Sequence, residues 1–161
     1  MSVATAVADR YAAAQTDSGL VEAALWVEQL GAVAYAAAAG GPLAGAARIP
    51  AQRFAVHEQE HAAAFATMLL ALTVPVSVHA GAADVDALMP AVRDGGHRAA
   101  LAALAELEGA AIAGHQTLAR RLRAVDIMRT AGMVSGGAAQ HLVVLRSALG
   151  QPPTRAFENG L

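Results

Sequence analysis

Apolar residues recur along most of this chain at the spacing of one face of an α-helix, and no stretch shows convincing β-strand alternation. Leu25, Leu30, Val33 and Ala37 mark such a face in the first long segment, and this spacing predicts an amphipathic helix. Clusters of glycine and proline separate this segment from three others of similar length. The pattern therefore predicts an all-α protein built on four long helices.

Capping residues and helix breakers set the expected bounds of these helices. Aspartate and serine are favoured N-caps, and proline is favoured in the first turn of a helix. Clusters of glycine and proline end a helix because both residues disfavour its continuation. We expect a short leading helix from Val3 to Ala14, and long helices from Asp17 or Ser18 to the GGP at 40–42, from the IPAQRF at 49–54 to about Leu72, from His97 to about Leu122, and from Val125 to Gly150.

The connections between the four long helices differ in length. The first and third are short, whereas the second covers residues 74–96, with one turn of helix expected after Asp84. One long crossover between the second and third helices is typical of one class of four-helix bundle. We interpret residues 1–161 as a single domain, with the main bundle at about 18–150 and an extended tail at 151–161.

The composition excludes several classes of function. Apolar residues make up 56% of the chain and charged residues 15%, against roughly 25% charged in an average soluble domain. The absence of cysteine excludes disulfides, iron–sulfur clusters and thiolate zinc sites. The net charge is −2, so we expect no nucleic-acid partner. The basic cluster at Arg120, Arg121 and Arg123 lies where a helix should end, and it complements the helix dipole there.

Neither a targeting segment nor a membrane span is expected. The first residues lack the basic stretch and apolar run of a signal peptide, so we expect a cytoplasmic protein. Residues 61–83 carry no charged side chain other than histidine, but Pro75 interrupts them, and the unbroken part is shorter than the ~20 residues of a membrane span. We interpret them as a buried helix end that runs into a loop. The apolar surplus also favours a homodimer over a monomer.

The stretch AVHEQEHAAAF at 55–65 contains two overlapping metal-binding patterns. The first is H-E-x-x-H, the helical signature of zinc metalloproteases. That interpretation needs a third ligand and an edge strand for a peptide substrate, and the sequence offers neither. The second is E-x-x-H at Glu58 and His61, which is one part of a di-metal site in a four-helix bundle. The second interpretation needs matching partners on the other helices.

A weak internal repeat supplies those partners. When the chain is aligned with itself at an offset of 80 residues, Glu28 matches Glu108 and His61 matches His141. Most of the other identities at this offset are alanines, which carry little information in so alanine-rich a chain. The evidence for the repeat is that a glutamate, a histidine and the predicted helices all coincide at the same offset.

The repeat and the motif together predict a two-metal site. Such a site takes one glutamate from each of two helices and an E-x-x-H pair from the other two. Residues three apart on a helix are offset by about 60° and one turn, so both side chains reach the same interior point. The expected ligands, drawn from four helices, are Glu28, Glu58, His61, Glu108 and His141.

Helical spacing also predicts the surroundings of several other polar residues. Glu60 lies about 200° from Glu58 and is expected in solvent, and the repeat leaves Glu106 outside the site. His57 lies about 40° from His61, so we expect it at the edge of the site.

Two further polar residues follow the candidate glutamates. Tyr35 and His115 each come seven residues after one of them, near the same helix face. Each could orient a ligand carboxylate by a hydrogen bond or be an ordinary, partly buried polar residue. Trp26 and the phenylalanines are expected in the core.

These segments resemble the ferritin-like superfamily, in particular bacterial ferritin-like domain proteins, over roughly residues 18–160. The resemblance rests on LWVEQLGAVAYAAAA, AVHEQEHAAAF, LAELEGAAIAGH, GGAAQHLVVLRSALG and the tail PPTRAFENG. It implies a ferritin-like four-helix bundle with one long crossover between the second and third helices. It also implies that the five residues above bind one or two ions of iron, manganese or zinc. The implied function is iron-dependent oxidoreduction or iron handling, and the alternative is a metal-free bundle that acts as a structural or binding module.

The chain departs from this family pattern at one ligand position. Ala138 stands where the second E-x-x-H would have its glutamate. An intact site has four carboxylates and two imidazoles, whereas this chain offers three carboxylates and two imidazoles. We therefore expect a metal to favour the half formed by Glu28, Glu58 and His61. Gly136 and Gly137 are expected to leave room beside Ala138.

Overall fold

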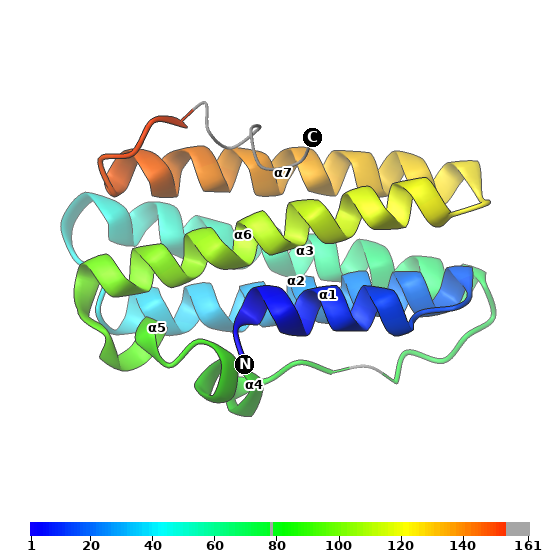
Figure 1. Ribbon diagram of the computed structural model, residues 1–161, viewed down its shortest axis with the longest axis horizontal. Coiled ribbons are helices and arrows are strands. Elements are labelled where there is room, and N and C mark those ends of the chain that lie inside the picture. The colour runs from blue at the N-terminus through cyan, green and yellow to red at the C-terminus, as the bar shows by residue number, and fades with distance from the viewer. Residues whose placement is uncertain (78, 154–161) are drawn as a thin grey trace.

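The protein is a bundle of helices, and the structure, a computed structural model, describes residues 1–77 and 79–153. This part of the chain contains no β-strand, so the all-α prediction is confirmed. Four long helices lie side by side along the length of the molecule, and the shorter ones cover one side (Figure 1). The helices are α1 (Val3–Ala13), α2 (Asp17–Gly40), the 3₁₀ turn η1 (Gly45–Ala47), α3 (Arg48–Ala71), α4 (Ala82–Leu88), α5 (Ala91–Asp94), α6 (Gly96–Arg121) and α7 (Val125–Ala148).

The observed helix ends differ from the expected ones at two places. Thr16, and not Asp17 or Ser18, is the N-cap of α2, because its hydroxyl accepts a hydrogen bond from the Gly19 N–H at 3.1 Å. A cap of this kind contributes about 1 kcal/mol. The long connection holds two short helices where one turn after Asp84 was expected, and Asp84 itself accepts from the Gly81 N–H at the start of α4.

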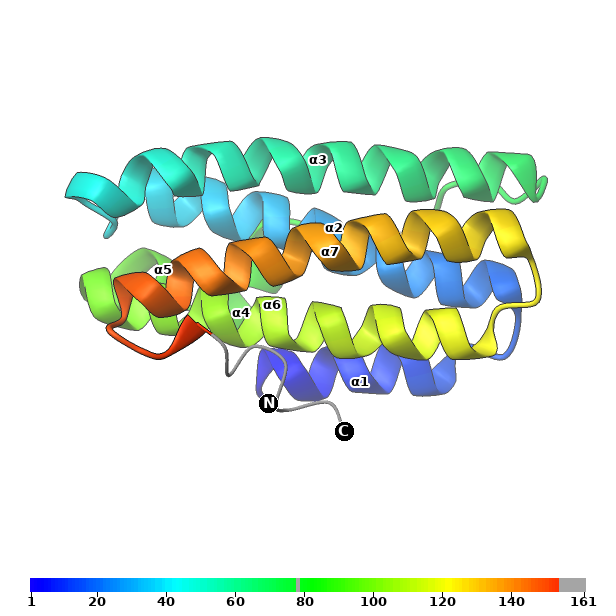
Figure 2. The same ribbon diagram turned by 90° about the horizontal axis from the view of Figure 1, so that it is seen from above.

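The long helices pack as two antiparallel pairs, α2 with α3 and α6 with α7. Each pair is joined by a short connection, whereas the connection that carries α4 and α5 leads from α3 back to the start of α6. Figure 2 shows α3 on the side of the bundle opposite α1, with α6 next to α1. The expected long crossover between the second and third long helices is therefore present. Of the expected tail at 151–161, residues 154–161 lie outside the described residues.

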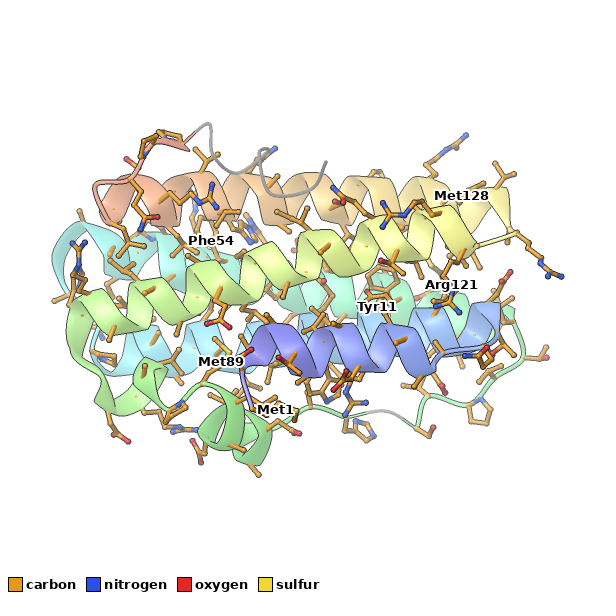
Figure 3. The ribbon with its side chains drawn as sticks, in the orientation of Figure 1. Met1, Tyr11, Phe54, Met89, Arg121 and Met128 are labelled. Atoms are coloured by element: carbon orange, nitrogen blue, oxygen red, sulfur yellow. The ribbon has the colours of Figure 1, made fainter. Side chains whose placement is uncertain are left out.

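The leading helix α1 is held against α6 by a close contact and by Arg121. The Tyr11 ring lies over Gly114, where a Cβ atom would come within 2.2 Å of it, so only glycine fits this position. Arg121 donates hydrogen bonds to the backbone carbonyls of Tyr11 and Ala14 (Figure 3). The basic cluster thus complements the C-terminal end of α1 as well as the end of its own helix.

Helix α2 lies at the centre of the core. It carries most of the large buried side chains of the first half of the chain, including Trp26 and Leu30, and Phe65 of α3 is fully buried nearby. Among the described residues, α2 is the one helix long and apolar enough to cross a membrane, but 72% of its most apolar window is buried inside the bundle. This is consistent with a core helix of a soluble protein. The cytoplasmic location stays a prediction.

Candidate metal centre

Five polar side chains from four helices meet in the interior of the bundle. They are Glu28 of α2, Glu58 and His61 of α3, Glu108 of α6 and His141 of α7. The glutamates and His141 are between 1% and 5% exposed, whereas the His61 side chain is 20% exposed. The structure therefore brings together all five residues that the motif and the repeat selected. Their role as metal ligands stays a prediction.

Helical geometry explains which acidic residues point inward. Glu58 and His61 lie one turn apart and face the same interior point, whereas Glu60 of the same helix is exposed. On α6 the neighbouring positions separate in the same way, with Glu108 buried and Glu106 exposed. Burying a carboxylate costs several kcal/mol unless it is paired. Three of them at one place therefore need cationic or hydrogen-bonding partners.

The five residues form two triads that share Glu58. In the first, His61 Nδ1 lies 3.0 Å from Glu28 Oε2 and 3.7 Å from Glu58 Oε2. In the second, His141 Nδ1 lies 2.9 Å from Glu58 Oε1 and 3.0 Å from Glu108 Oε1. In each triad the possible ligand atoms all lie within 4.8 Å of one another. Glu58 presents one oxygen to each side, which is the arrangement of a bridging carboxylate.

The two triads contain the same ligand types. Each combines two carboxylates with one imidazole, because Glu58 counts in both. Ligand count therefore gives no reason for a metal to prefer the triad of Glu28, Glu58 and His61, which the sequence had suggested. The triads differ instead in exposure, since His61 is partly open to solvent and His141 is not.

The neighbours of the two histidines account for that difference. The His57 Nδ1 atom lies 3.2 Å from His141 Nε2, and the Phe54 ring stacks on the His141 ring at 3.9 Å. His57 thus contacts the cluster through α7 and not through His61 of its own helix. An outer partner of this kind fixes the tautomer of a metal-binding histidine. On the other side, Gly137 has no side chain with which to cover His61.

Two glycines shape the space around the cluster. A Cβ atom at Gly31 would lie 3.1 Å from Glu58 Cγ, and one at Gly137 would lie 2.8 Å from His61 Cε1. Gly136 faces open space. The expectation that Gly137 leaves free room beside Ala138 is therefore wrong, because the His61 ring occupies that room. No motif in the sequence indicated that Gly31 makes room for the Glu58 side chain.

Burial and close contacts shift the pKa values of the cluster. Burial raises the pKa of Glu58 to about 8, helped by the charges of Glu28 and Glu108. Burial lowers the pKa of both histidines, but their carboxylate partners outweigh it and raise the pKa to about 10 for His61 and about 9 for His141. Burial also raises the pKa of Glu28, yet His115 and His61 bring it below its ordinary value overall. The metal-free cluster therefore holds protons at neutral pH.

Two buried carboxylate oxygens lack a well-aligned hydrogen-bond donor within the described part of the chain. Glu28 Oε1 lies 3.0 Å from His115 Nε2, and Glu58 Oε1 lies 2.9 Å from His141 Nδ1, but neither contact has the geometry of a hydrogen bond. Buried polar atoms are nearly always paired, so each unpaired one needs an explanation. Oxygen and nitrogen donors of this kind suit iron, manganese or zinc. The donor set and these two oxygens thus fit divalent ions.

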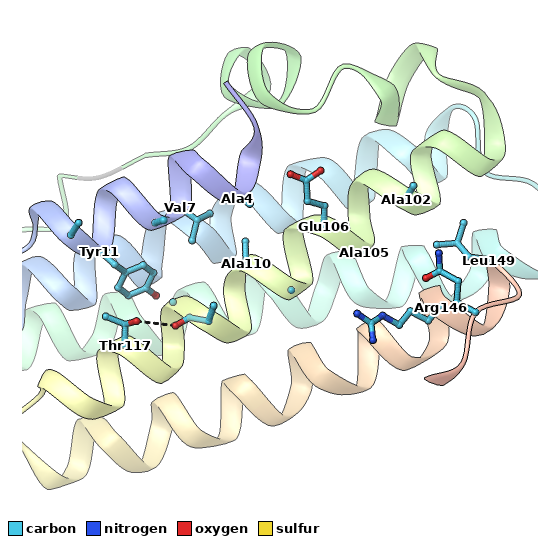
Figure 4. Close-up of a pocket in the computed structure, with 16 residues that line it drawn as sticks. Ala4, Val7, Tyr11, Ala102, Ala105, Glu106, Ala110, Thr117, Arg146 and Leu149 are labelled. Carbon is cyan, nitrogen blue, oxygen red and sulfur yellow. Dashed lines mark hydrogen bonds between the residues drawn. The ribbon is translucent and has the colours of Figure 1, made fainter. Parts of the chain in front are cut away.

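A separate hollow lies between α1, α6 and the end of α7. Its volume is about 710 Å³, and small residues such as Ala105 and Ala110 line much of it (Figure 4). Glu106 and Arg146 border it, and Tyr11 reaches across it from α1 (Figure 4). None of the five candidate ligands lines this hollow. The chemistry described above is therefore in the bundle interior and not in this surface feature.

Comparisons of the chain with protein-family models, curated proteins and solved structures found no match.

Proposed function

We propose that this protein is a ferritin-like metal-binding protein whose two triads hold a pair of divalent ions. The observation that carries the proposal is the pair of triads sharing Glu58, with all five side chains supplied by four different helices. The long crossover between the two helix pairs supports the ferritin-like part of the proposal. Iron is the first ion to test, with manganese and zinc as the other ions that suit these ligands.

Distances within the cluster support the proposal. Carboxylate oxygen and imidazole nitrogen bind such ions at about 2.1 Å, so two ligand atoms at right angles around one ion lie about 3.0 Å apart. His141 Nδ1 lies 2.9 Å and 3.0 Å from its two carboxylate neighbours. The same spacing suits a hydrogen bond, so distance alone does not separate the two cases. Glu28 Oε1 and Glu58 Oε1 favour an ion, because in the metal-free cluster their histidine contacts lack the geometry of hydrogen bonds.

Each side chain has a defined part in the proposed function. Bound ferrous ions would supply electrons to dioxygen, so the default chemistry is iron oxidation or iron handling. Glu58 would hold both positions, and Glu28 and Glu108 would close the two ends. His61, as the partly exposed member, lies on the side of the cluster that solvent reaches. His141, the fifth residue, is buried under Phe54 and His57, which shield its side of the cluster from water.

Metal content tests the proposal directly. Protein purified without chelators and then dialysed against ferrous or manganous ions is expected to hold between one and two ions per chain. Elemental analysis of the protein after removal of free metal gives this ratio. A ratio near zero under all loading conditions would contradict the proposal. It would favour the alternative of a metal-free bundle whose carboxylates and imidazoles satisfy one another.

The metal-free protein is expected to lose stability as pH rises, while the stabilisation that metal adds is expected to grow. Without metal, folded Glu58 keeps a proton up to about pH 8, and His61 and His141 keep theirs up to about pH 10 and pH 9. The unfolded chain releases these protons at lower pH, so the free energy of unfolding falls as pH rises from about 6 to 9. Bound ions displace the same protons, so metal affinity rises over that range.

Urea unfolding at pH 6, 7.5 and 8.5 checks this expectation. One series contains a chelator and the other contains excess manganous ion. The difference in unfolding free energy between the two series is expected to grow with pH. A metal-free protein that gains stability from pH 6 to 8.5 would show that the cluster does not hold the inferred protons.

A further inference from the structure

Two polar residues next to the cluster contact the glutamate of the opposite helix pair. At the offset of 80 residues, Tyr35 of α2 corresponds to His115 of α6. The Tyr35 hydroxyl donates a hydrogen bond of 2.5 Å to Glu108 Oε1, on α6. His115 Nε2 lies 3.0 Å from Glu28 Oε1, on α2. The two contacts therefore cross between the central helices α2 and α6.

Neither side chain has another evident reason for its polarity. Tyr35 is completely buried, and burial raises the pKa of its phenol well above the ordinary value, helped by the Glu108 charge, so it is a neutral donor. His115 is 1% exposed, and its ring nitrogens have no well-aligned hydrogen-bond partner within the described residues. Polar groups without partners are costly in a core. The carboxylate of Glu28 is the group that the His115 ring faces at contact distance.

We infer that Tyr35 and His115 are positioning residues that brace the two terminal carboxylates of the centre, each from the opposite helix. This inference rests on the proposed function, because bracing matters most for carboxylates that bind ions. Tyr35 directs Glu108 toward His141 and Glu58, and His115 directs Glu28 toward His61. The brace ties α2 to α6 at the level of the cluster, so both triads keep their shape before an ion arrives.

The brace also differs between the two ends. The phenol of Tyr35 has a single O–H donor, whereas the imidazole of His115 can carry its N–H on either of two ring nitrogens. Hydrogen-bond partners that orient ligands typically contribute a factor of about 10–100 to metal affinity. Removing one brace is therefore expected to weaken one of the two ion positions more than the other.

The contact of Tyr35 with Glu108 is tested by cobalt titration of Tyr35→Phe against a matched control. Tyr11→Phe also removes a buried hydroxyl, but the Tyr11 hydroxyl makes no hydrogen bond to the cluster or to any other described residue. We expect Tyr35→Phe to weaken one of the two cobalt-binding steps by about 10–100-fold. The visible cobalt spectrum of that step should change as well. Tyr11→Phe is expected to bind cobalt as the parent does, and equal affinities for the two variants would overturn the brace.

The contact of His115 with Glu28 is tested by rescue with a conservative replacement. Glutamine can place an N–H where the His115 Nε2 atom lies, whereas leucine fills the space without a donor. We expect His115→Leu to lose about 10–100-fold in affinity for one cobalt ion, and His115→Gln to recover most of it. If the leucine and glutamine variants bind cobalt with the same affinity, His115 acts by packing and the inference is wrong for His115.

A metal-free measurement separates failure of the brace from failure of the proposed function. If the parent protein binds no cobalt, the proposed function fails. A double-mutant cycle then tests whether the Tyr35–Glu108 hydrogen bond stabilises the metal-free protein. The melting-temperature shifts of Tyr35→Phe and Glu108→Gln are expected to be non-additive, because the two side chains share one hydrogen bond. Additive shifts would overturn the brace in the metal-free protein too.

Discussion

Replacing Glu58 with glutamine is expected to abolish tight binding of both ions while leaving the metal-free protein folded. Glu58 is the one residue common to the two triads, with one oxygen toward each. A neutral amide cannot supply the bridging charge, so both ion positions lose a ligand at once. The loss of affinity should exceed the roughly 10–100-fold that removal of an outer partner causes.

The metal-free form is expected to tolerate this change because Glu58 is already largely protonated at pH 7. Its pKa of about 8 results from burial and from the charges of Glu28 and Glu108. Glutamine resembles the protonated acid in size and also carries no charge. It also keeps the fit against Gly31, which leaves room for this side chain. The melting temperature of the metal-free variant is therefore expected to equal or exceed that of the parent.

Isothermal titration with manganous ion and thermal unfolding with a chelator measure these two quantities. Glu60→Gln is the matched control, because Glu60 lies on the same helix but is exposed. The control should bind ions as the parent does. A Glu58→Gln variant that still binds two ions with parental affinity would show that the triads are not the binding site.

Helix positions were predictable from the sequence because apolar periodicity and breakers are local signals. The leading helix and the four long helices appear close to their expected bounds. The packing of α1 was not predictable, since it depends on the Tyr11 ring meeting Gly114 about a hundred residues later. For the crossover, the sequence predicted one helical turn where the structure has two short helices. Stretches of seven and four residues are too short to show a clear apolar periodicity.

The convergence of the candidate ligands was also predictable, and for a physical reason. A repeated pair of helices places equivalent residues at equivalent heights, so Glu28 and Glu108 meet in the interior with Glu58, His61 and His141. Periodicity gives the face of a residue but not which neighbouring helix that face meets. The crossed contacts of Tyr35 and His115 therefore emerged only from the packed bundle.

The repeat also explains why the missing carboxylate at position 138 is not simply an absent side chain. Glu58 fits against α2 because Gly31 has no Cβ, and the same offset places Ala111 on α6 where Gly31 stands on α2. Ala111 and Ala138 are both buried. In the second half, an alanine thus replaces the glycine as well as the glutamate. By the repeat, we expect a glutamate at position 138 to meet the Ala111 Cβ atom, as Glu58 would meet a Cβ atom at Gly31.

Restoring both features is expected to give a larger gain in metal binding than restoring the carboxylate alone. Ala138→Glu adds a fourth carboxylate to the three present, which offsets the charge of two divalent ions more completely. Ala111→Gly is expected to make room for it, at roughly 1 kcal/mol of helix stability. We expect the double variant to bind the second ion at least about 10-fold more tightly than the parent, because a charged ligand replaces water or nothing. The single Ala138→Glu variant should gain less, since its side chain must displace Ala111.

Without metal, the same carboxylate is expected to destabilise the bundle. A buried, unpaired carboxylate either costs several kcal/mol or takes up a proton through a raised pKa. The variants should therefore melt below the parent in chelator and rise toward or above it with ferrous or manganous ion. Gln140→Glu is the matched control, because it adds the same charge two residues away at an exposed position. If the double variant is destabilised and binds no more metal than this control, the cluster is not one carboxylate short of a complete two-ion site, and the structural bundle becomes the better interpretation.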